Sequence, residues 1–358
     1  MPGAHEQRKG RGAASNDSGR FEVEKRVAFD DGWGTADEEP MPLRTTLSID
    51  ATRTIIARND SPDIGFDRSI NPYRGCEHGC IYCYARPSHA YLGLSPGLDF
   101  ESRLFYKPQA AKLLAAELRK TGYICRPIAL GSNTDPYQPV ERKHEITRAI
   151  LEVLRAFRHP VTIVTKSALV QRDLDILGEM ARDRLATVTI SVTTLDRRLA
   201  RVMEPRAATP ERRLDTITAL AAAGVPAGVL SAPMIPALND SEMEQILERA
   251  RAAGATSAGY TLLRLPLELK SLFKEWLEAN FPAKAAHVLS LVAQTHGGQL
   301  YDSTWFKRKT GTGPYAEVLR LRFERACRKL GFNERTMQAL DTGRFLQPPQ
   351  KGDQLALF

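Results

Sequence analysis

Three cysteines lie close together in the segment Cys-Glu-His-Gly-Cys-Ile-Tyr-Cys. Cys76, Cys80 and Cys83 have the spacing CxxxCxxC, which brings three thiolates to one loop and supplies no fourth. Thiolates are the usual protein ligands of iron–sulfur clusters, and a cubane bound by four of them has no open iron. The segment therefore predicts a 4Fe-4S cluster that keeps one iron free for another ligand.

Zinc is the alternative metal for these cysteines. Structural zinc sites have four protein ligands, usually as two pairs joined by a longer loop. In this chain His78 or His89 would have to complete a Cys3His set. The spacing favours the cluster, and a nucleic-acid-binding protein with a structural metal site remains the rival class.

The use of cysteine also indicates a compartment. The chain has five cysteines, an odd number, and no apolar segment follows its polar start. No stretch is long enough and apolar enough to span a bilayer. Disulfides are rare in the reducing cytosol. We therefore expect a cytoplasmic protein without a membrane segment, in which Cys125 and Cys327 are small buried hydrophobic residues.

The cysteine segment resembles the cluster loop of the radical S-adenosylmethionine (radical SAM) superfamily. The residues that carry the resemblance are the three cysteines and the aromatic Tyr82 just before the third. The resemblance implies that the open iron binds the amino and carboxylate groups of S-adenosylmethionine, with Tyr82 against the adenine. It also implies an external electron donor and reductive cleavage of the cofactor to a 5′-deoxyadenosyl radical.

A repeated strand and helix pattern follows the cysteine segment. Short apolar runs that end in polar residues alternate with longer amphipathic segments, as in a parallel α/β sheet. About six such units predict a partial (β/α)6 TIM-type barrel, which also resembles the partial barrel of the superfamily. The predicted strands are 69–74, 127–130, 161–164, 188–192, 228–230 and 259–263.

Composition divides the rest of the chain. Residues 1–40 have few apolar positions, so we expect a disordered leader. A lead-in precedes the barrel, and a helical extension and a flexible tail follow it. Their predicted bounds are 41–67 for the lead-in, 68–265 for the barrel, 266–340 for the extension and 341–358 for the tail. Amphipathic spacing predicts extension helices over 268–278, 284–294 and 316–329.

Polar residues at the ends of the predicted strands are the candidate cofactor contacts. The carboxyl ends of the strands meet at one edge of such a barrel, where the following loops build the site. Ser132 and Asp135 follow the second strand. The Asp135 carboxylate suits the ammonium group of the cofactor, although Asp-Pro is also a common turn sequence. The further candidates are Lys166, Ser191, Thr193, Glu204 and Arg206.

Each further candidate has an ordinary structural alternative. Lys166 would meet a carboxylate or a phosphate, or would extend along the surface. Ser191 and Thr193 suit ribose hydroxyls but are also ordinary strand residues. Glu204 and Arg206 would bind ribose and carboxylate, or would pair with each other.

Within the superfamily, the chain resembles the branch that contains spore photoproduct lyase, a DNA-repair enzyme. The segments that carry this resemblance are 71–84, 132–135 and 203–206, with Tyr82 and Tyr84 on both sides of the third cysteine. The resemblance makes Tyr84 and Asp135 the candidate catalytic residues. Gly131 stands where that enzyme has a hydrogen-donating cysteine, so its repair chemistry does not carry over directly.

Charge and the last residues point to nucleic acid. The formal net charge is +8, which favours contact with phosphates. The final Gln-Leu-Ala-Leu-Phe resembles the peptide by which bacterial repair proteins dock on the replication sliding clamp, or it packs on the protein itself. We expect damaged or modified nucleic acid as the substrate, with a protein or a small molecule as the alternative. The clamp residues would be Gln354, Leu355, Leu357 and Phe358.

Overall fold

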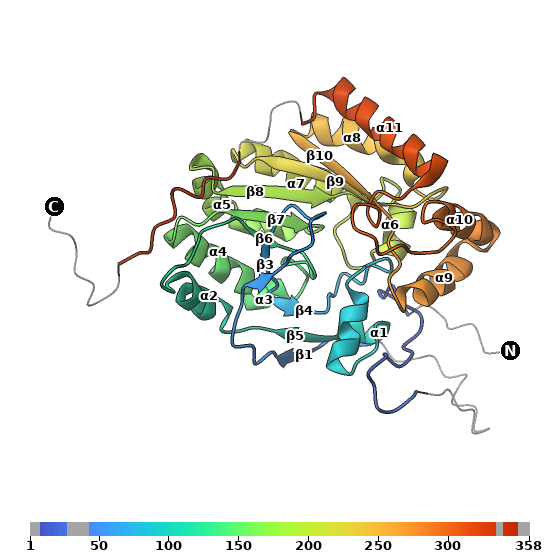
Figure 1. Cartoon of the computed structure of the whole chain (residues 1–358), viewed down its shortest axis with the longest axis horizontal. Coiled ribbons are helices and arrows are strands. Elements are labelled where there is room, and N and C mark those ends of the chain that lie inside the picture. Colours follow the sequence, from blue (N-terminus) through green and yellow to red (C-terminus); the bar gives the residue numbers. More distant parts are fainter. Residues whose placement is uncertain (1–7, 27–42, 334–338, 350–358) are drawn as a thin grey trace.

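The computed structural model describes residues 8–26, 43–333 and 339–349. At its centre lies a seven-stranded sheet in the order β10-β9-β8-β7-β6-β3-β2. All neighbouring strands of this sheet are parallel except β2, which is antiparallel to β3 (Figure 1). The strands are β2 (Ala57–Arg58), β3 (Arg68–Ile70), β6 (Ile128–Leu130), β7 (Val161–Thr165), β8 (Ala186–Ser191), β9 (Ala227–Met234) and β10 (Ser257–Leu262).

The parallel sheet confirms the predicted α/β class. The predicted strand 69–74 is split between two sheets, and the predicted strand 228–230 is longer, as β9. Pro72 interrupts the segment 69–74, since proline has no amide hydrogen for a sheet ladder. Beyond the proline, the chain enters a three-stranded sheet in the order β1-β5-β4. Its strands are β1 (Thr46–Ile49), β4 (Tyr73–Arg74) and β5 (Arg103–Tyr106).

Helices connect the parallel strands and cover the sheet. In α4 (Ile146–Ala156), the apolar residues Ile146, Ile150 and Leu154 recur at helical spacing and are buried. They pack in one core with the sheet residues Leu130 and Ile163. The other connecting helices are α2 (Ala110–Leu118), α3 (Glu141–His144), η3 (Ala168–Asp173), α5 (Leu174–Arg182), α6 (Arg197–Met203), α7 (Pro210–Ala222), η4 (Asp240–Glu242) and α8 (Met243–Ala252).

Three helices follow the last strand, close to their predicted bounds. They are α9 (Leu269–Asn280), α10 (Pro282–Gln294) and α11 (Gly313–Leu330). The first two form a second core with the cysteine segment, in which Phe273 and Trp276 pack with Ile81 and Tyr82. The helix α11 lies beside α8 at the β10 end of the sheet (Figure 1). The helical extension therefore supports the cysteine segment.

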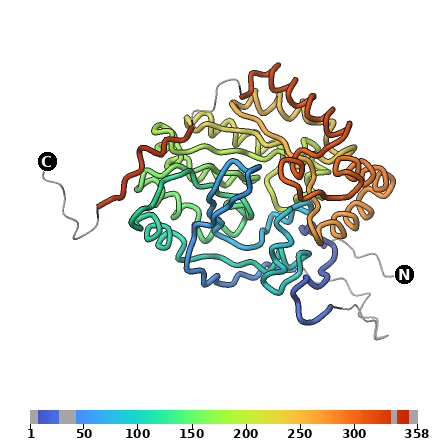
Figure 2. The backbone as a smooth tube through the Cα atoms, viewed as in Figure 1, coloured from blue at the N-terminus to red at the C-terminus, as the bar shows by residue number. Residues whose placement is uncertain are grey.

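The segment 339–349 lies near the amino ends of the parallel strands, away from α11 (Figure 2). The Phe345 ring contacts Tyr123 and Phe157, with centroid distances of 5.4 and 6.4 Å. The Leu346 amide donates to the Phe157 carbonyl at 3.0 Å. These contacts differ from the flexible tail expected from residue 341. The predicted clamp motif at 354–358 lies outside the described residues.

Residues 8–26, which we call the N-terminal strap, also differ from the disordered leader expected over 1–40. The amides of Gly12 and Ala13 donate to the Glu101 carboxylate at 2.9 and 2.8 Å. Arg11 is buried and donates to the Glu101 carbonyl at 2.7 Å. Glu101 itself is fully buried in α1 (Leu98–Ser102) and pairs with buried Arg86 of η2 (Arg86–Leu92) at 2.5 Å. Composition did not reveal the strap because its order depends on this distant carboxylate.

Within residues 8–26, 43–333 and 339–349, the helices are all too short or too polar to cross a membrane.

The pair formed by Glu101 and Arg86 gives a stability prediction. We expect Glu101→Ala to lower the free energy of unfolding by about 3–5 kcal/mol, because it leaves a buried guanidinium without its partner. Urea denaturation followed by circular dichroism measures this loss. The control is Glu152→Ala, at an exposed helix position, which should change stability by less than about 0.5 kcal/mol. Equal effects of the two substitutions would contradict the structural role of Glu101.

Candidate functional site

The three cysteines lie in a tight loop between β4 and η2. Cys76 and Cys80 are buried and Cys83 is partly buried. Gly79, between the first two, has a φ of +67°, and a Cβ atom there would lie 2.6 Å from a Glu101 carboxylate oxygen. Only glycine fits without displacement. Arg86 closes the loop by donating to the carbonyls of Cys80 and Gly79 at 2.9 and 3.1 Å.

The surroundings of the thiols fit a thiolate-bound metal cluster. Burial raises the pKa of Cys80 to about 12, and the charge of Glu204 adds to this shift. Burial also raises the pKa values of Cys76 and Cys83. Metal binding removes the thiol proton, since a coordinated thiol is deprotonated. A loop with three soft donors, two buried and one partly buried, can thus supply the thiolate ligands of an iron–sulfur cluster.

Asp135 joins the cysteine loop to the sheet. Its carboxylate accepts hydrogen bonds from the Thr165 hydroxyl at 2.6 Å and the Lys166 amide at 2.8 Å. It also lies 3.3 Å from Nδ1 of His78, a residue of the cysteine loop. Burial raises the pKa of Asp135, but the charge and hydrogen bond of His78, together with the hydrogen bonds from Thr165 and Lys166, outweigh it and lower the pKa to about 2. The Tyr137 amide also donates to Asp135, so the predicted turn is present as well.

Lys166 points into the site from the end of β7. Its Nζ donates to the Ser191 hydroxyl at 3.1 Å and lies 5.7 Å from the centre of the Tyr82 ring. This placement differs from the alternative in which the lysine extends along the surface. Ser191, the last residue of β8, donates to the Ala232 carbonyl at 3.2 Å, and the Thr193 hydroxyl oxygen lies 3.0 Å from the same carbonyl oxygen. The polar ends of β7 and β8 therefore converge on Tyr82.

Glu204 holds the hydroxyl end of Tyr82 in place. Its carboxylate accepts hydrogen bonds from the Tyr82 hydroxyl and from the Thr193 hydroxyl, the latter at 2.7 Å. Its other oxygen pairs with buried Arg213 of α7. Burial raises the pKa of Glu204, but the charges of Arg213 and Lys166 outweigh it and hold the pKa near 2.

One interpretation of the sequence was that Glu204 and Arg206 pair with each other. In the structure they do not. Arg206 lies 3.2 Å from Glu77 of the cysteine loop instead. Arg213 was missed by the sequence analysis. The sequence feature that could have revealed Arg213 is its helical spacing from the buried apolar residues Ile217 and Leu220, on one face of α7. A charge on a buried helix face indicates a buried partner.

Ser132 and Tyr84 lie at the open side of the cysteine loop. The Tyr84 hydroxyl donates to the Ser132 carbonyl, and the Tyr84 ring is 45% exposed. The Arg264 guanidinium, just beyond β10, lies 4.7 Å from the centre of this ring. Asn71 holds the segment after β6 by accepting from the Asn133 amide at 3.0 Å.

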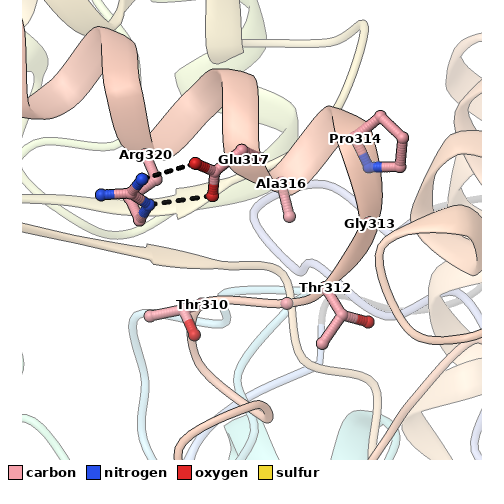
Figure 3. A pocket seen from close by; sticks show the side chains of 8 residues that line it. Thr310, Thr312, Gly313, Pro314, Ala316, Glu317 and Arg320 are labelled. Atoms are coloured by element: carbon pink, nitrogen blue, oxygen red, sulfur yellow. Dashed lines mark hydrogen bonds and ion pairs between the residues drawn. The ribbon is translucent and has the colours of Figure 1, made fainter.

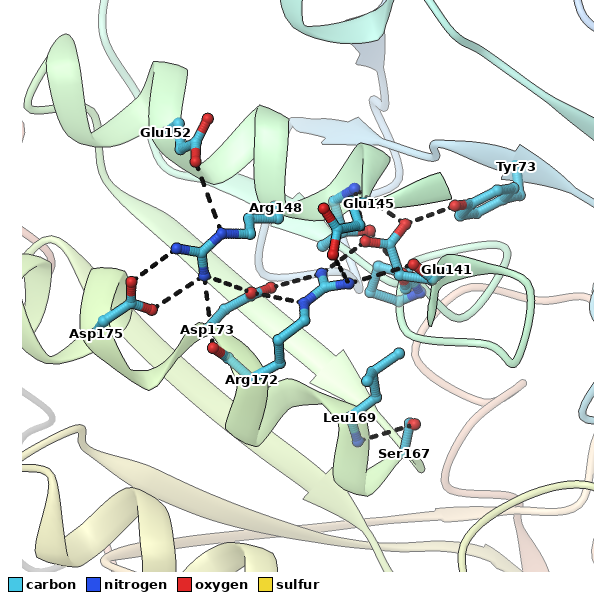
Figure 4. Close-up of polar contacts among 12 residues, drawn as sticks. Tyr73, Glu141, Glu145, Arg148, Glu152, Ser167, Leu169, Arg172, Asp173 and Asp175 are labelled. Atoms are coloured by element: carbon cyan, nitrogen blue, oxygen red, sulfur yellow. Dashed lines mark hydrogen bonds and ion pairs between the residues drawn. The ribbon is translucent and has the colours of Figure 1, made fainter. Parts of the chain in front are cut away.

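A buried polar network fixes the loops that follow β6 and β7 (Figure 4). Glu141 is fully buried and accepts from the Tyr73 hydroxyl at 2.5 Å and from Arg172 at 2.7 Å. Arg172 also bonds to buried Asp173, which in turn pairs with Arg148. The buried carboxylates are thus matched by two arginines. We interpret the network as scaffold, because its charges are already paired within it.

Comparison with known proteins identifies the family. The profile of the Radical SAM superfamily matches residues 70–250, half of the chain. The chain belongs to this superfamily. The cofactors of this superfamily are a 4Fe-4S cluster and S-adenosylmethionine. The matched residues include the cysteine loop and the ends of β6, β7, β8 and β9.

Relatives match more than half of the chain. An uncharacterised protein of Mycobacterium tuberculosis is 39% identical over 219 residues, which are 61% of this chain and 64% of that protein. This chain thus spans slightly less than two thirds of the relative's length. An uncharacterised protein of Methanocaldococcus jannaschii is 29% identical over 60% of this chain and 76% of its own length.

Solved structures of spore photoproduct lyase share the fold. A tyrosine-to-phenylalanine mutant of that protein has a TM-score of 0.58 at 14% identity. A structure of the lyase complexed with dinucleoside spore photoproduct has a TM-score of 0.57 at 15% identity. Each alignment covers 80% of both chains. The parallel sheet is thus consistent with the TIM-like fold of the superfamily.

The buried pair of Glu204 and Arg213 gives a second prediction. We expect Glu204→Gln and Arg213→Met each to cost about 3–5 kcal/mol of stability, because each leaves one buried charge unpaired. The double variant should lose less than the sum, with a coupling of at least about 1 kcal/mol. Urea denaturation of the four proteins in this cycle measures the coupling. Losses that add within about 0.5 kcal/mol would show that the two charges act independently.

Proposed function

We propose that this protein is a cytoplasmic radical SAM enzyme with a partial (β/α)6 barrel that acts on damaged or modified nucleic acid. The observation that carries the proposal is the meeting of the three-cysteine loop with the polar ends of β6, β7 and β8. Asp135 and Lys166 reach this loop from the sheet. A cluster-binding loop at the carboxyl edge of parallel strands is the arrangement that cofactor chemistry requires.

Cys76, Cys80 and Cys83 hold the cluster in this proposal. When bound, the cluster and S-adenosylmethionine supply a 5′-deoxyadenosyl radical, after reduction by an external electron donor. The rest of the site orients the cofactor. The Tyr82 ring faces the adenine, and the Asp135 carboxylate receives the ammonium group.

The remaining polar residues have separate roles in the proposal. Lys166 faces the carboxylate of the cofactor, because its ammonium group points toward Tyr82. Ser191 and Thr193 offer hydroxyls to the ribose from the end of β8. Arg206 contributes positive charge at the edge of the cysteine loop. Glu204 positions Tyr82, since its oxygens bond to Tyr82, Thr193 and Arg213.

Ser132 and Tyr84 complete the site on its open side. Both lie where a substrate approaches the cysteine loop, and the Tyr84 hydroxyl is fixed by the Ser132 carbonyl. We therefore assign Tyr84 to the substrate and Ser132 to the cofactor's amino end. The substrate class is supported by the net charge of +8 and by the fold shared with a lyase whose structure holds a dinucleoside lesion.

The hydrogen-donating cysteine of spore photoproduct lyase has no counterpart at Gly131. This glycine has a φ of +90°, and a Cβ atom there would lie 2.1 Å from the Val164 carbonyl oxygen. A cysteine at this position would require the β7 backbone to move. We therefore propose a reaction that differs from that of spore photoproduct lyase in its source of hydrogen.

The zinc alternative is less consistent with the geometry. His78 faces Asp135, and the His89 Nε2 lies 2.9 Å from the Arg103 carbonyl. Within the described ranges, no three His, Cys, Asp or Glu side chains are grouped as around a single ion. Ligands of one zinc ion lie within about 4 Å of each other, because each Zn–S bond is about 2.3 Å. Cluster ligands are farther apart, since they bind different irons.

Cofactor cleavage tests the radical chemistry. The protein is reconstituted without oxygen, reduced with dithionite and given S-adenosylmethionine, and 5′-deoxyadenosine is measured. We expect product from the wild type and from Cys125→Ala, but only background from the variant with Cys76→Ala, Cys80→Ala and Cys83→Ala. Iron content should change little in His78→Ala and His89→Ala. Bound zinc that these two substitutions release would contradict the cluster.

Added substrate tests the nucleic-acid assignment in the same assay. Oligonucleotides of DNA and RNA, intact or irradiated with ultraviolet light, should raise the rate of 5′-deoxyadenosine formation above the rate without substrate. An increase in this rate only with peptides or metabolites would show that the substrate is a protein or a small molecule and not nucleic acid. The radical chemistry itself would then still stand.

We also propose that the C-terminal residues Gln354, Leu355, Leu357 and Phe358 dock on the replication sliding clamp. Their deletion should abolish binding to purified clamp in surface plasmon resonance and leave the melting temperature unchanged. An alanine substitution at Gln347, before the motif, is the control and should keep clamp binding. A lower melting temperature without any clamp binding by the intact chain would show that the motif packs on the protein.

A further inference from the structure

Two large aromatic rings face solvent between α10 and α11. Trp305 and Phe306 are adjacent in the chain and are 53% and 64% exposed. Apolar side chains of this size are usually buried, because their contact with water is unfavourable. Two such rings side by side in a loop indicate a surface that is covered when a ligand binds.

The backbone holds Phe306 in a strained conformation. Its φ is +67°, in the left-handed region that bulky residues rarely adopt. Asp63 maintains this conformation from another part of the chain. Its carboxylate accepts from the Phe306 amide at 3.4 Å and from Arg308 Nε at 2.6 Å. Lys309 Nζ donates to the Asp63 carbonyl at 2.7 Å. Strain that the surroundings maintain is typical of functional positions.

The loop adjoins the candidate site. The Leu262 amide, in the last residue of β10, donates to the Lys309 carbonyl at 2.8 Å. Arg264, two residues further, lies over the Tyr84 ring, and Tyr84 directly follows Cys83. The Nε atom of Arg264 is buried and has no hydrogen-bond partner within the part of the chain that the structure describes. A partly free guanidinium thus lies between the loop and the cysteine segment.

The loop also carries basic residues. Lys307 is exposed next to the two rings, and Arg308 and Lys309 follow it. The Arg264 guanidinium, 4.7 Å from the centre of the Tyr84 ring, adds positive charge beside this exposed tyrosine. Aromatic rings that stack on bases, next to cations that attract phosphates, are the combination by which proteins bind single-stranded nucleic acid.

We propose that residues 301–309 form a platform that binds single-stranded nucleic acid and leads it to the candidate site. Trp305 and Phe306 stack on successive bases, Lys307 contacts a phosphate, and Arg264 with Tyr84 receives the part of the strand nearest the cysteine loop. The proposal rests on the proposed function, because it names the element that holds that substrate. DNA and RNA share the bases and phosphates that such a platform recognises.

The neighbouring pocket at the start of α11 does not belong to the platform. It is lined by Thr310 and Thr312 of the preceding loop and by Pro314, Glu317 and Arg320 of α11 (Figure 3). The two charged residues pair with each other at 2.5 Å. Their charges are therefore matched, and the platform ends where this pocket begins.

Fluorescence anisotropy tests the platform with the full chain. The probes are fluorescein-labelled twelve-nucleotide single strands of mixed sequence, one of DNA and one of RNA, and the DNA duplex of the same sequence. We expect Trp305→Ala and Phe306→Ala each to weaken single-strand binding at least about fivefold, the lower end of the usual stacking contribution. Lys307→Ala should reduce the slope of log Kd against log salt by about one.

Matched controls separate the platform from general effects. Tyr91→Ala removes an aromatic ring that is 71% exposed on η2, and Lys274→Ala removes an exposed lysine of α9. Both should leave Kd and the salt slope unchanged. Circular dichroism and melting temperatures show whether each variant is folded. Quenching of Trp305 fluorescence by the single strands, measured as the difference between wild type and Trp305→Ala, gives a readout that a structural role alone would not produce.

The outcomes distinguish the platform from the proposed function. Loss of binding in the platform variants, with stronger binding of single strands than of duplex, supports the platform, and the DNA and RNA probes show which strand it prefers. If the wild type binds and neither Trp305→Ala nor Phe306→Ala changes Kd, the platform proposal is wrong. The proposal of a nucleic-acid substrate would still stand. Absence of wild-type binding to all three probes overturns both.

Discussion

The buried ion pair of Arg86 and Glu101 is the interaction on which the cysteine loop depends. Both side chains are fully buried, so each needs the other and further hydrogen bonds to offset the loss of water. Arg86 meets this need by bonding to the carbonyls of Gly79 and Cys80, and Glu101 by accepting the amides of Gly12 and Ala13. The pair thus connects the N-terminal strap, α1 and the loop that presents three thiols.

Two further buried carboxylates connect this loop to the parallel sheet. Asp135 reaches His78 from the end of β6, and Glu204 reaches Tyr82 from the end of α6. Since each carboxylate also has partners at the end of β7 or β8, the loop and the strand ends form one rigid unit. A site that must orient a cofactor at one iron requires such fixed geometry. The Lys166 ammonium group points toward the Tyr82 ring, between the loop and the strand ends.

The sequence was sufficient for features that depend on local pattern. The spacing of the cysteines indicated the metal chemistry, and apolar runs such as 161–164 and 188–192 indicated the buried parallel strands. It was insufficient for pairings between distant segments. Neither the contact of Gly12 with Glu101 nor that of Glu204 with Arg213 leaves a local pattern, because each depends on how the chain folds back on itself. A pair of Glu204 with Arg206 was one of two interpretations of the sequence, and in the structure Glu204 pairs with Arg213 instead.

The central claim is that the three-cysteine loop holds a 4Fe-4S cluster with one iron open to S-adenosylmethionine. Electron paramagnetic resonance of the anaerobically reconstituted and reduced protein tests it most directly. We expect the signal of a reduced 4Fe-4S cluster whose g values shift when S-adenosylmethionine is added. Hyperfine coupling to a nitrogen-15 label in the amino group should then appear. A cluster signal that the cofactor leaves unchanged, without such coupling, would contradict the claim.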